Sequence, residues 1–274
     1  MRESFRCLTR PVMVALVCVL IPLAAPGADD PALTKDQIKV FLQTAEVIKS
    51  KQSAIGVTHP WRLTLSNGTI THDASFQPVD EHKSEMKLES GRVEFAFVDS
   101  YKNNLAAYQL AELIGLDDML PVYVERKWQG HTGSLSWWLP VKMDDAERVR
   151  KKIDAPDTDK WNKQMYRVRV FDELVYDTDP NLTNVLIGED WTIWRVDFSR
   201  AFRTSKDLRE PKNLVKCDRQ LFEKLKALKA DEVTEKTKPY LSKSQVNGVM
   251  ARRDKIVATF QTLIAEKEEK EVLH

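Results

Sequence analysis

Residues 168–202, VRVFDELVYDTDPNLTNVLIGEDWTIWRVDFSRAF, decide how the rest of this chain is interpreted. The amphipathic run at the start of this stretch predicts a helix, and the polar residues 177–181, which include Pro180, predict the loop that ends it. Two apolar runs, 185–187 and 191–196, enclose a Gly-Glu-Asp turn and predict a β-hairpin. The second run ends on Asp197. The order is therefore helix, polar loop, hairpin and acid.

Three oxygen-bearing side chains in this stretch have the spacing of a phosphoryl-transfer site. Asp179 and Asn184 are separated as in the D-x-x-x-x-N pattern of kinase catalytic loops, and Asp197 follows the next strand. With these residues the chain resembles the protein-kinase-like superfamily, and the nearest likeness is the phosphatidylinositol 3-/4-kinase and HipA-type branch. The resemblance implies an α+β, bilobed kinase-like fold, in which a β-rich N-lobe carries one main helix and the C-lobe is mostly helical.

The same resemblance implies a role for each of these side chains. Asp179 would be the catalytic base that orients the acceptor, while Asn184 and Asp197 would hold Mg²⁺ beside the phosphates of ATP. Carboxylate and amide oxygens are the hard ligands that Mg²⁺ prefers. Each residue also has an ordinary structural explanation, because Asp-Pro-Asn is a common turn and an Asp after a strand often caps a helix.

Two positions in the front half depart from the kinase pattern together. The segment 74–78, ASFQP, has Gln77 where the related kinases carry the lysine that holds the nucleotide phosphates. Asn104 stands where their next helix carries the glutamate that pairs with that lysine. Two amides can hydrogen-bond to each other across strand and helix, so we expect Gln77 and Asn104 to form a neutral pair that contacts the nucleotide.

Three further positions affect the nucleotide and phosphate contacts. Gly68, at the Asn-Gly turn of a hairpin predicted over residues 61–76, is the glycine expected to approach the phosphates. Trp138 is a candidate for contact with adenine, with core packing as the alternative. Pro180 replaces an arginine of the related kinases and so removes a guanidinium. Arg200 and Arg203 either contact phosphate or pair with acids of the helix that precedes the loop, and we expect the pairing.

The start of the chain predicts export. Arg2, Arg6 and Arg10 precede an apolar run over residues 12–23, and Ala25-Pro26-Gly27 offers small residues for cleavage. Residues 1–27 therefore have the pattern of a signal peptide, and the run is short for a membrane span. We expect a periplasmic or secreted protein without a stable membrane span after cleavage. The chain has 42 basic and 41 acidic side chains, a balance that argues against a nucleic-acid partner.

The remaining residues divide into three predicted regions. Residues 28–58 form a helical extension, in which Thr34 and Gln37 make a capping box and the apolar stripe runs to Ile48. Residues 59–140 form the β-rich N-lobe, where a charged segment, 80–91, separates the first hairpin from a strand over 93–98. Residues 141–274 form the helical C-lobe with the catalytic-loop hairpin, and its charged end is expected to fray.

Three functional hypotheses remain open at this point. The first is an exported, ATP-dependent phosphotransferase, and the second is an exported pseudokinase that binds a nucleotide or a partner without catalysis. The third is an α+β interaction domain whose loop matches a kinase by chance. The metal-site residues favour the first hypothesis, while Gln77, Asn104 and Pro180 favour the second. The sequence leaves the acceptor open among protein, lipid headgroup, sugar and small metabolite.

Overall fold

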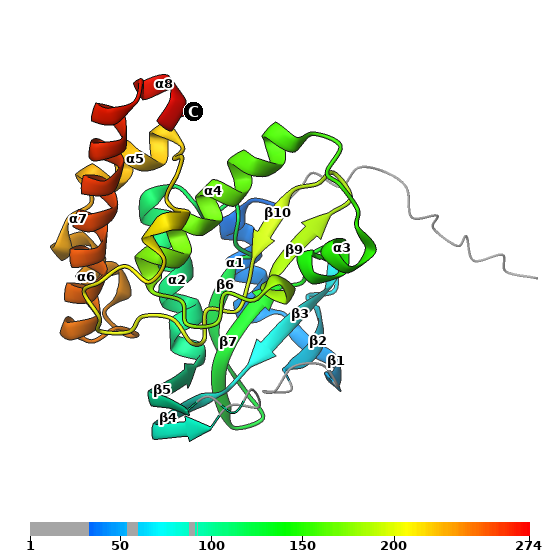
Figure 1. The fold of residues 1–274 in the computed structure, drawn as a ribbon. Coiled ribbons are helices and arrows are strands. Elements are labelled where there is room, and N and C mark those ends of the chain that lie inside the picture. Colours follow the sequence, from blue (N-terminus) through cyan, green and yellow to red (C-terminus); the bar gives the residue numbers. More distant parts are fainter. Residues whose placement is uncertain (1–32, 54–59, 88–90, 92) are drawn as a thin grey trace, which may run out of the picture. The chain divides into compact units, whose positions relative to one another are not determined.

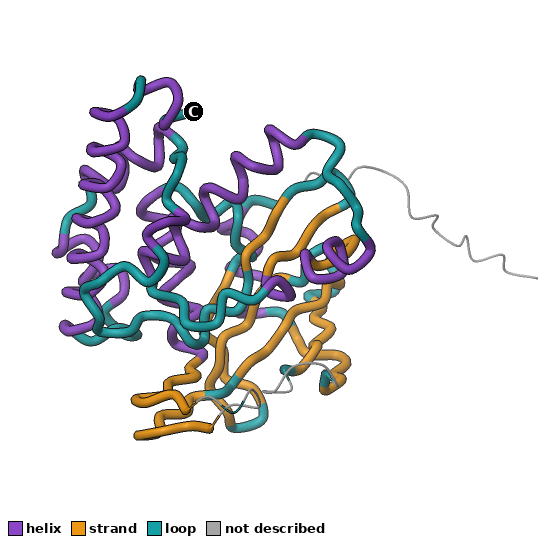
Figure 2. The backbone as a smooth tube through the Cα atoms, viewed as in Figure 1, coloured by secondary structure: helices purple, strands orange, loops and turns teal. Residues whose placement is uncertain are grey.

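The computed structural model describes residues 33–53, 60–87, 91 and 93–274. The predicted signal peptide, residues 1–27, lies outside the described residues. Residues Thr34–His274 form one compact unit. Its strands come mostly from the first half of the chain and its helices mostly from the second (Figures 1 and 2). This is the α+β organisation that the sequence predicts.

A five-stranded antiparallel sheet occupies the first half, with the strand order β1-β2-β3-β7-β6. Its strands are β1 (Glu46–Gln52), β2 (Trp61–Ser66), β3 (Thr71–Gln77), β6 (Tyr123–Trp128) and β7 (His131–Trp137). Two helices, α1 (Lys35–Thr44) and α2 (Tyr101–Ile114), pack against β6 and β7. The Asn-Gly turn joins β2 to β3 as predicted, and Gly115 ends α2 at a φ of +72°.

The helical extension is shorter than predicted and is followed by a strand. The capping box of Thr34 and Gln37 is present. The helix ends at Thr44, however, and Ile48 lies in β1 with 57% of its surface exposed. Two β-branched residues, Val47 and Ile48, favour a strand, and β2 offers a pairing edge through its register with β1. The spacing of apolar residues in the sequence does not reveal that β2 offers this pairing edge.

The charged segment between the hairpin and the next strand is itself a strand. β4 (Asp80–Lys87) pairs with β5 (Val93–Ser100) as a separate two-stranded sheet. Almost every residue of β4 is exposed, so the apolar-polar alternation that marks a half-buried strand is absent. The hairpin β4–β5 adjoins α2, whose first residue, Tyr101, donates its backbone N–H to Val79.

The second half begins with a three-stranded sheet of order β10-β9-β8. These strands are β8 (Val141–Asp144), β9 (Val185–Gly188) and β10 (Ile193–Arg195). Between β8 and β9 lie α3 (Asp145–Lys151), α4 (Thr158–Val175) and the 3₁₀ turn η1 (Leu182–Asn184). The predicted order of helix, loop and hairpin is confirmed. β8 is an addition, since the sequence was expected to turn helical after residue 140.

Helices complete the chain and pack on α4 and α2. They are α5 (Arg219–Ala227), α6 (Ala230–Thr237), α7 (Lys243–Glu266) and α8 (Glu269–Val272), preceded by the 3₁₀ turn η2 (Pro211–Asn213). Residues 266–271, the charged run that the sequence predicts to fray, are exposed, while beyond them Val272 and Leu273 are buried and His274 donates its N–H to the carbonyl of Cys217. Among the described helices, none has both the length and the apolar composition that a bilayer crossing requires.

Candidate functional site

Arg195, on β10, fixes the loop that follows α4. Its guanidinium is fully buried and uses all three nitrogens. Nε donates to Asp172 Oδ1 at 3.1 Å, Nη2 donates to Asp177, and Nη1 donates to the carbonyls of Asn184, at 3.3 Å, and Val196. Burial raises the pKa of Asp172 to about 7 and also raises that of Asp177. The loop is thus tied to the hairpin by one buried cation between two acids.

Asp179 and Asn184 lie at the two ends of this loop and are joined by a hydrogen bond. The backbone N–H of Asp179 donates to Asp177 Oδ1 at 3.0 Å. The side chain of Asp179 is 42% exposed. Asn184 Nδ2 donates to the carbonyl of Asp179 at 3.4 Å. The amide oxygen of Asn184 is therefore the atom of that side chain that can meet a cation, and the carboxylate of Asp179 is open to solvent.

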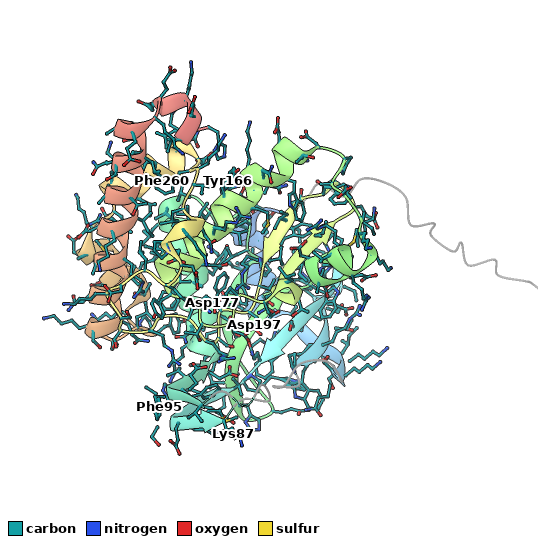
Figure 3. All side chains as sticks on the ribbon, in the orientation of Figure 1. Lys87, Phe95, Tyr166, Asp177, Asp197 and Phe260 are labelled. Atoms are coloured by element: carbon teal, nitrogen blue, oxygen red, sulfur yellow. The ribbon has the colours of Figure 1, made fainter. Side chains whose placement is uncertain are left out.

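Asp197 is the second residue after the end of β10 and lies beside the loop. Its backbone has a φ of +59°, a left-handed conformation that Asp tolerates better than most residues. Val196 donates its N–H to the carbonyl of Asn184 at 3.0 Å, which places Asp197 next to η1. Figure 3 draws Asp177 and Asp197 in the same central region, and the negative charge of Asp197 adds to the burial that raises the pKa of Asp177.

The segment after Asp197 is held by two neighbouring asparagines of α2. Asn103 Nδ2 donates to the carbonyls of Ser199 and Ala201, at 2.8 and 3.1 Å. Asn104 Oδ1 accepts the backbone N–H of Phe198 at 2.7 Å. Both side chains are buried. The first turn of α2 therefore sets the path of the chain on the far side of Asp197.

Gln77 and Asn104 form the neutral pair that the sequence predicts. Asn104 Nδ2 donates to Gln77 Oε1 at 2.6 Å and lies 3.4 Å from the Ser134 hydroxyl on β7. The two residues are 9% and 1% exposed. Gly133 is required beside this pair, since a Cβ there would lie 2.6 Å from the Gln77 carbonyl. Because Asn104 also binds Phe198, the pair connects β3 to the segment that follows Asp197.

The other predicted nucleotide contacts are Gly68 and Trp138. The backbone groups of both residues make hydrogen bonds to other residues of the chain. Gly68 sits at the hairpin tip with a φ of +87°, and its N–H donates to the Ser66 hydroxyl at 3.3 Å. Trp138 donates its N–H to the carbonyl of Asp73 at 3.1 Å, and its own carbonyl lies 3.0 Å from His72 Nε2. Trp138 is 38% exposed, and the guanidinium of Arg62 lies over its ring, 4.3 Å from the ring centre.

Arg200 and Arg203 have other partners than the sequence suggests. Both were expected to pair with acids of the helix before the loop. Instead, both donate to Glu94 on β5, and Arg200 Nη1 also lies 3.3 Å from Asp179 Oδ2. The acids of α4 are occupied by Arg195 and by backbone N–H groups. These arginines therefore tie the segment after Asp197 to the β4–β5 hairpin.

Two residues of this region, Arg195 and Asp99, were not identified from the sequence. Arg195 had a usable signal, because it lies two residues after the buried Ile193 on a short strand and therefore on the same, buried face. Asp99, at the end of β5, had none. Its carboxyl is 9% exposed, and its Oδ1 has no hydrogen-bond partner in the described part of the chain. Burial raises the pKa of Asp99 to about 6.

A groove of about 620 Å³ lies next to the loop. The β4–β5 hairpin, residues 202–205 and the start of α7 form its walls, and Tyr176 and Thr178 reach it from the loop itself. Its lining mixes apolar side chains such as Phe202 with the charged Glu94 and Arg203. Thr178, one of the residues that line the groove, directly precedes Asp179 in the chain.

The donor set fits Mg²⁺ and does not fit a soft metal. No group of three or more His, Cys, Asp or Glu side chains with metal-binding geometry occurs among the described residues. One carboxylate, Asp197, and one amide oxygen, Asn184, match a cation that keeps several waters and completes its shell with phosphate oxygens. Nucleotide phosphates would therefore be part of such a site.

Comparison with known proteins supports the fold alone. No protein-family model matches the chain, and no curated protein matches it in sequence. Among solved structures, the fold is similar to that of the proinflammatory kinase CtkA of Helicobacter pylori, with a TM-score of 0.55 and 8% sequence identity. The match covers 82% of this chain and 98% of that kinase. The chain therefore has a kinase-like fold, with a sheet-rich first region and a helical second region.

Proposed function

We propose that this protein is an exported phosphotransferase that moves the γ-phosphate of ATP to a hydroxyl-bearing acceptor. The observation that carries the proposal is the connection of three predicted residues in one kinase-like fold. Asn184 bonds to the Asp179 carbonyl, and its own carbonyl accepts the N–H of the residue before Asp197. Phosphoryl transfer needs a positioned metal and base more than covalent chemistry, and these side chains can supply both.

Each residue has a distinct role in this proposal. Asp179, whose side chain is 42% exposed, accepts the proton of the acceptor hydroxyl. Asn184 and Asp197 hold Mg²⁺, which when bound neutralises charge on the phosphates. Arg195 does not touch substrate, and it positions the loop through Asp172 and Asp177. The phosphatidylinositol 3-/4-kinase and HipA-type branch remains the family that we propose, on the sequence pattern around Asp179 and Asp197.

The acceptor is proposed to bind in the groove beside Thr178. A volume of about 620 Å³ falls in the range of small-molecule sites and also accommodates a peptide side chain. Export of the protein, through cleavage of residues 1–27, belongs to the same proposal and rests on the leader pattern of the sequence. Gln77, Asn104, Gly68 and Trp138 are proposed to surround the nucleotide.

Release of phosphate from γ-labelled ATP tests the proposal, with water as the acceptor. Asp179→Asn should lower turnover about 10²- to 10⁴-fold while nucleotide affinity changes little, because a base acts in the transition state. Asp197→Asn should remove the Mg²⁺ dependence of ATP binding. Asp254→Asn, on the exposed face of α7, is the matched control and should behave as the wild type. Turnover that survives Asp179→Asn would show that the base is misassigned.

A pseudokinase is the second candidate, and the neutral Gln77–Asn104 pair favours it. The two side chains are buried and hydrogen-bonded to each other at 2.6 Å. At the position in β3 where a lysine would hold the phosphates, the chain therefore has the neutral Gln77. A binding module of this kind would bind ATP or ADP without turnover above the Asp179→Asn background. Calorimetric binding together with phosphate release on one sample distinguishes the two candidates.

A further inference from the structure

The proposed site lacks a free positive charge at Gln77, Asn104, Pro180 and Arg195. Phosphoryl transfer places several negative charges beside Asp179 and Asp197, and proteins meet them with cations or N–H donors. Gln77 and Asn104 are neutral, and Pro180 has neither a charge nor an N–H. The guanidinium of Arg195 is already used by acids and carbonyls. A cation must therefore come from elsewhere.

Arg200 lies where such a cation is needed. Its carbonyl accepts the Thr178 hydroxyl at 2.9 Å, which ties its backbone to the loop. Its Nη1 is 3.3 Å from Asp179 Oδ2, and its Nη2 donates to Glu94. The side chain is 14% exposed, and the guanidinium packs 5.2 Å from the ring centre of Phe97. It is therefore held in place before any ligand arrives.

The guanidinium also has unused donor capacity. Arg200 Nε has no hydrogen-bond partner in the described part of the chain but is buried, so the nitrogen that a phosphate can reach is Nη1. The contact with Asp179 is 3.3 Å long and involves a carboxylate that is 42% exposed, so a phosphate can displace it. A guanidinium matches phosphate oxygens with two parallel N–H donors.

We propose that Arg200 binds the terminal phosphates of the nucleotide and supplies the charge that Gln77 and Pro180 do not. This inference rests on the proposed function and adds a residue to it. In the absence of nucleotide, Asp179 and Glu94 hold the guanidinium. When phosphates bind, they replace Asp179 as its partner, and the Asp179 carboxylate becomes free to accept the proton of the acceptor.

Arg203 provides a matched control on the same segment. It has the same charge, the same 14% exposure and the same partner, Glu94. Its other contact is with the carbonyl of Ala96 on β5, and it lines the groove next to the loop. If the arginines act only by tying the hairpin to the segment after Asp197, Arg200 and Arg203 should be equivalent.

Calorimetric titration of the full chain with adenosine, ADP and ATP in the presence of Mg²⁺ tests the proposal. Arg200→Gln should weaken ATP binding about tenfold or more and leave adenosine affinity within about twofold, since only the phosphate contact is lost. Arg200→Lys should recover part of the loss, and Arg203→Gln should stay close to the wild type. Glu94→Gln removes the hairpin tie but keeps the cation, so ATP affinity should be unchanged or higher.

Specific results would overturn this role for Arg200. Equal losses for Arg200→Gln and Arg203→Gln, or a Glu94→Gln variant that reproduces Arg200→Gln, would reduce Arg200 to a structural tie. A loss of adenosine affinity as large as the loss of ATP affinity would also reduce Arg200 to a structural tie. A wild-type chain that binds neither ATP nor ADP would instead remove the proposed function, and with it this role. Urea unfolding midpoints of all variants separate a binding loss from a folding loss.

Discussion

The loop side and the sheet side of the candidate site are built from different chemistry. On the loop side, Arg195 is buried between Asp172 and Asp177, and the ion pairs fix the backbone that carries Asp179. On the sheet side, Gln77 and Asn104 are equally buried but neutral. The difference teaches that charge is present where it holds the loop and absent at Gln77 and Asn104, the strand and helix positions that the kinase resemblance of the sequence assigns to a phosphate contact.

Breaking the loop side should give the largest effect. Arg195→Met leaves the buried Asp177 and the half-buried Asp172 without their cation, and we expect a loss of about 3–5 kcal/mol in the free energy of unfolding. Arg167→Met is the control, because that arginine makes a surface pair with the exposed Asp118 and should cost at most about 1 kcal/mol. Urea denaturation measures both. Equal losses would mean that the buried pairs do not hold the loop.

Asp99 sharpens the comparison, because it is a buried acid that keeps an oxygen without a hydrogen-bond partner in the described part of the chain. Its pKa is raised from 3.8 to about 6 by burial, so the folded state binds the proton more tightly than the unfolded state. Stability should therefore fall as pH rises through this range and stay level above it. Asp99→Asn removes the effect.

The measurement for Asp99 is urea unfolding at about pH 4 and about pH 8. Relative to wild type, Asp99→Asn should gain up to about 3 kcal/mol between the two conditions, which is the equivalent of the raised pKa. Asp207→Asn, at a carboxylate on the surface, is the control and should show no comparable gain. A difference between Asp99→Asn and wild type that does not change with pH would contradict the buried, proton-binding state of Asp99.

Introducing charged side chains at positions 77 and 104 tests why the sheet side of the site is neutral. Gln77→Lys and Asn104→Glu each bury an unpaired charge and should destabilise the fold, while the double variant can pair the two charges. The double-mutant cycle should therefore give a favourable coupling of about 1–3 kcal/mol. ATP affinity of the double variant should rise as well. Additive losses would mean that the two side chains no longer meet once they are charged.

The smallest effect should come from Ser134→Ala. The Ser134 hydroxyl lies 3.4 Å from Asn104 Nδ2, whereas Asn104 keeps its shorter bonds to Gln77 and Phe198. We expect a loss below about 1 kcal/mol in urea unfolding. A loss as large as that of Arg195→Met would show that the neutral side is as tightly coupled as the loop side.

The sequence predicted the parts of the fold that depend on local patterns. The Asn-Gly turn at Gly68, the capping box at Thr34 and the loop with its hairpin around Asp179 are all present. β1 and β4 were missed for physical reasons. The strand around Ile48 continues a helical apolar pattern, and β4 is exposed, so neither shows the alternation of a half-buried strand.

The sequence named the residues proposed for the candidate site but not all of the connections between them. The bond between Gln77 and Asn104 followed from two complementary amides. The partners of Arg200 did not, because Glu94 is more than a hundred residues away in the sequence and reaches it only through the β4–β5 hairpin. Asp99 has the same limitation, since its burial depends on packing against the segment after Asp197.

The central claim is that Asn184 and Asp197 meet at one metal ion beside bound nucleotide. Paramagnetic broadening by Mn²⁺ with ATP, measured on the isotopically labelled chain, tests it most directly. The side-chain amide of Asn184 and the backbone amide of Asp197 should lose intensity at substoichiometric Mn²⁺, and Asp197→Asn should abolish the effect. Signals of Asn184 and Asp197 that persist while others broaden, or broadening unchanged by Asp197→Asn, would contradict the account.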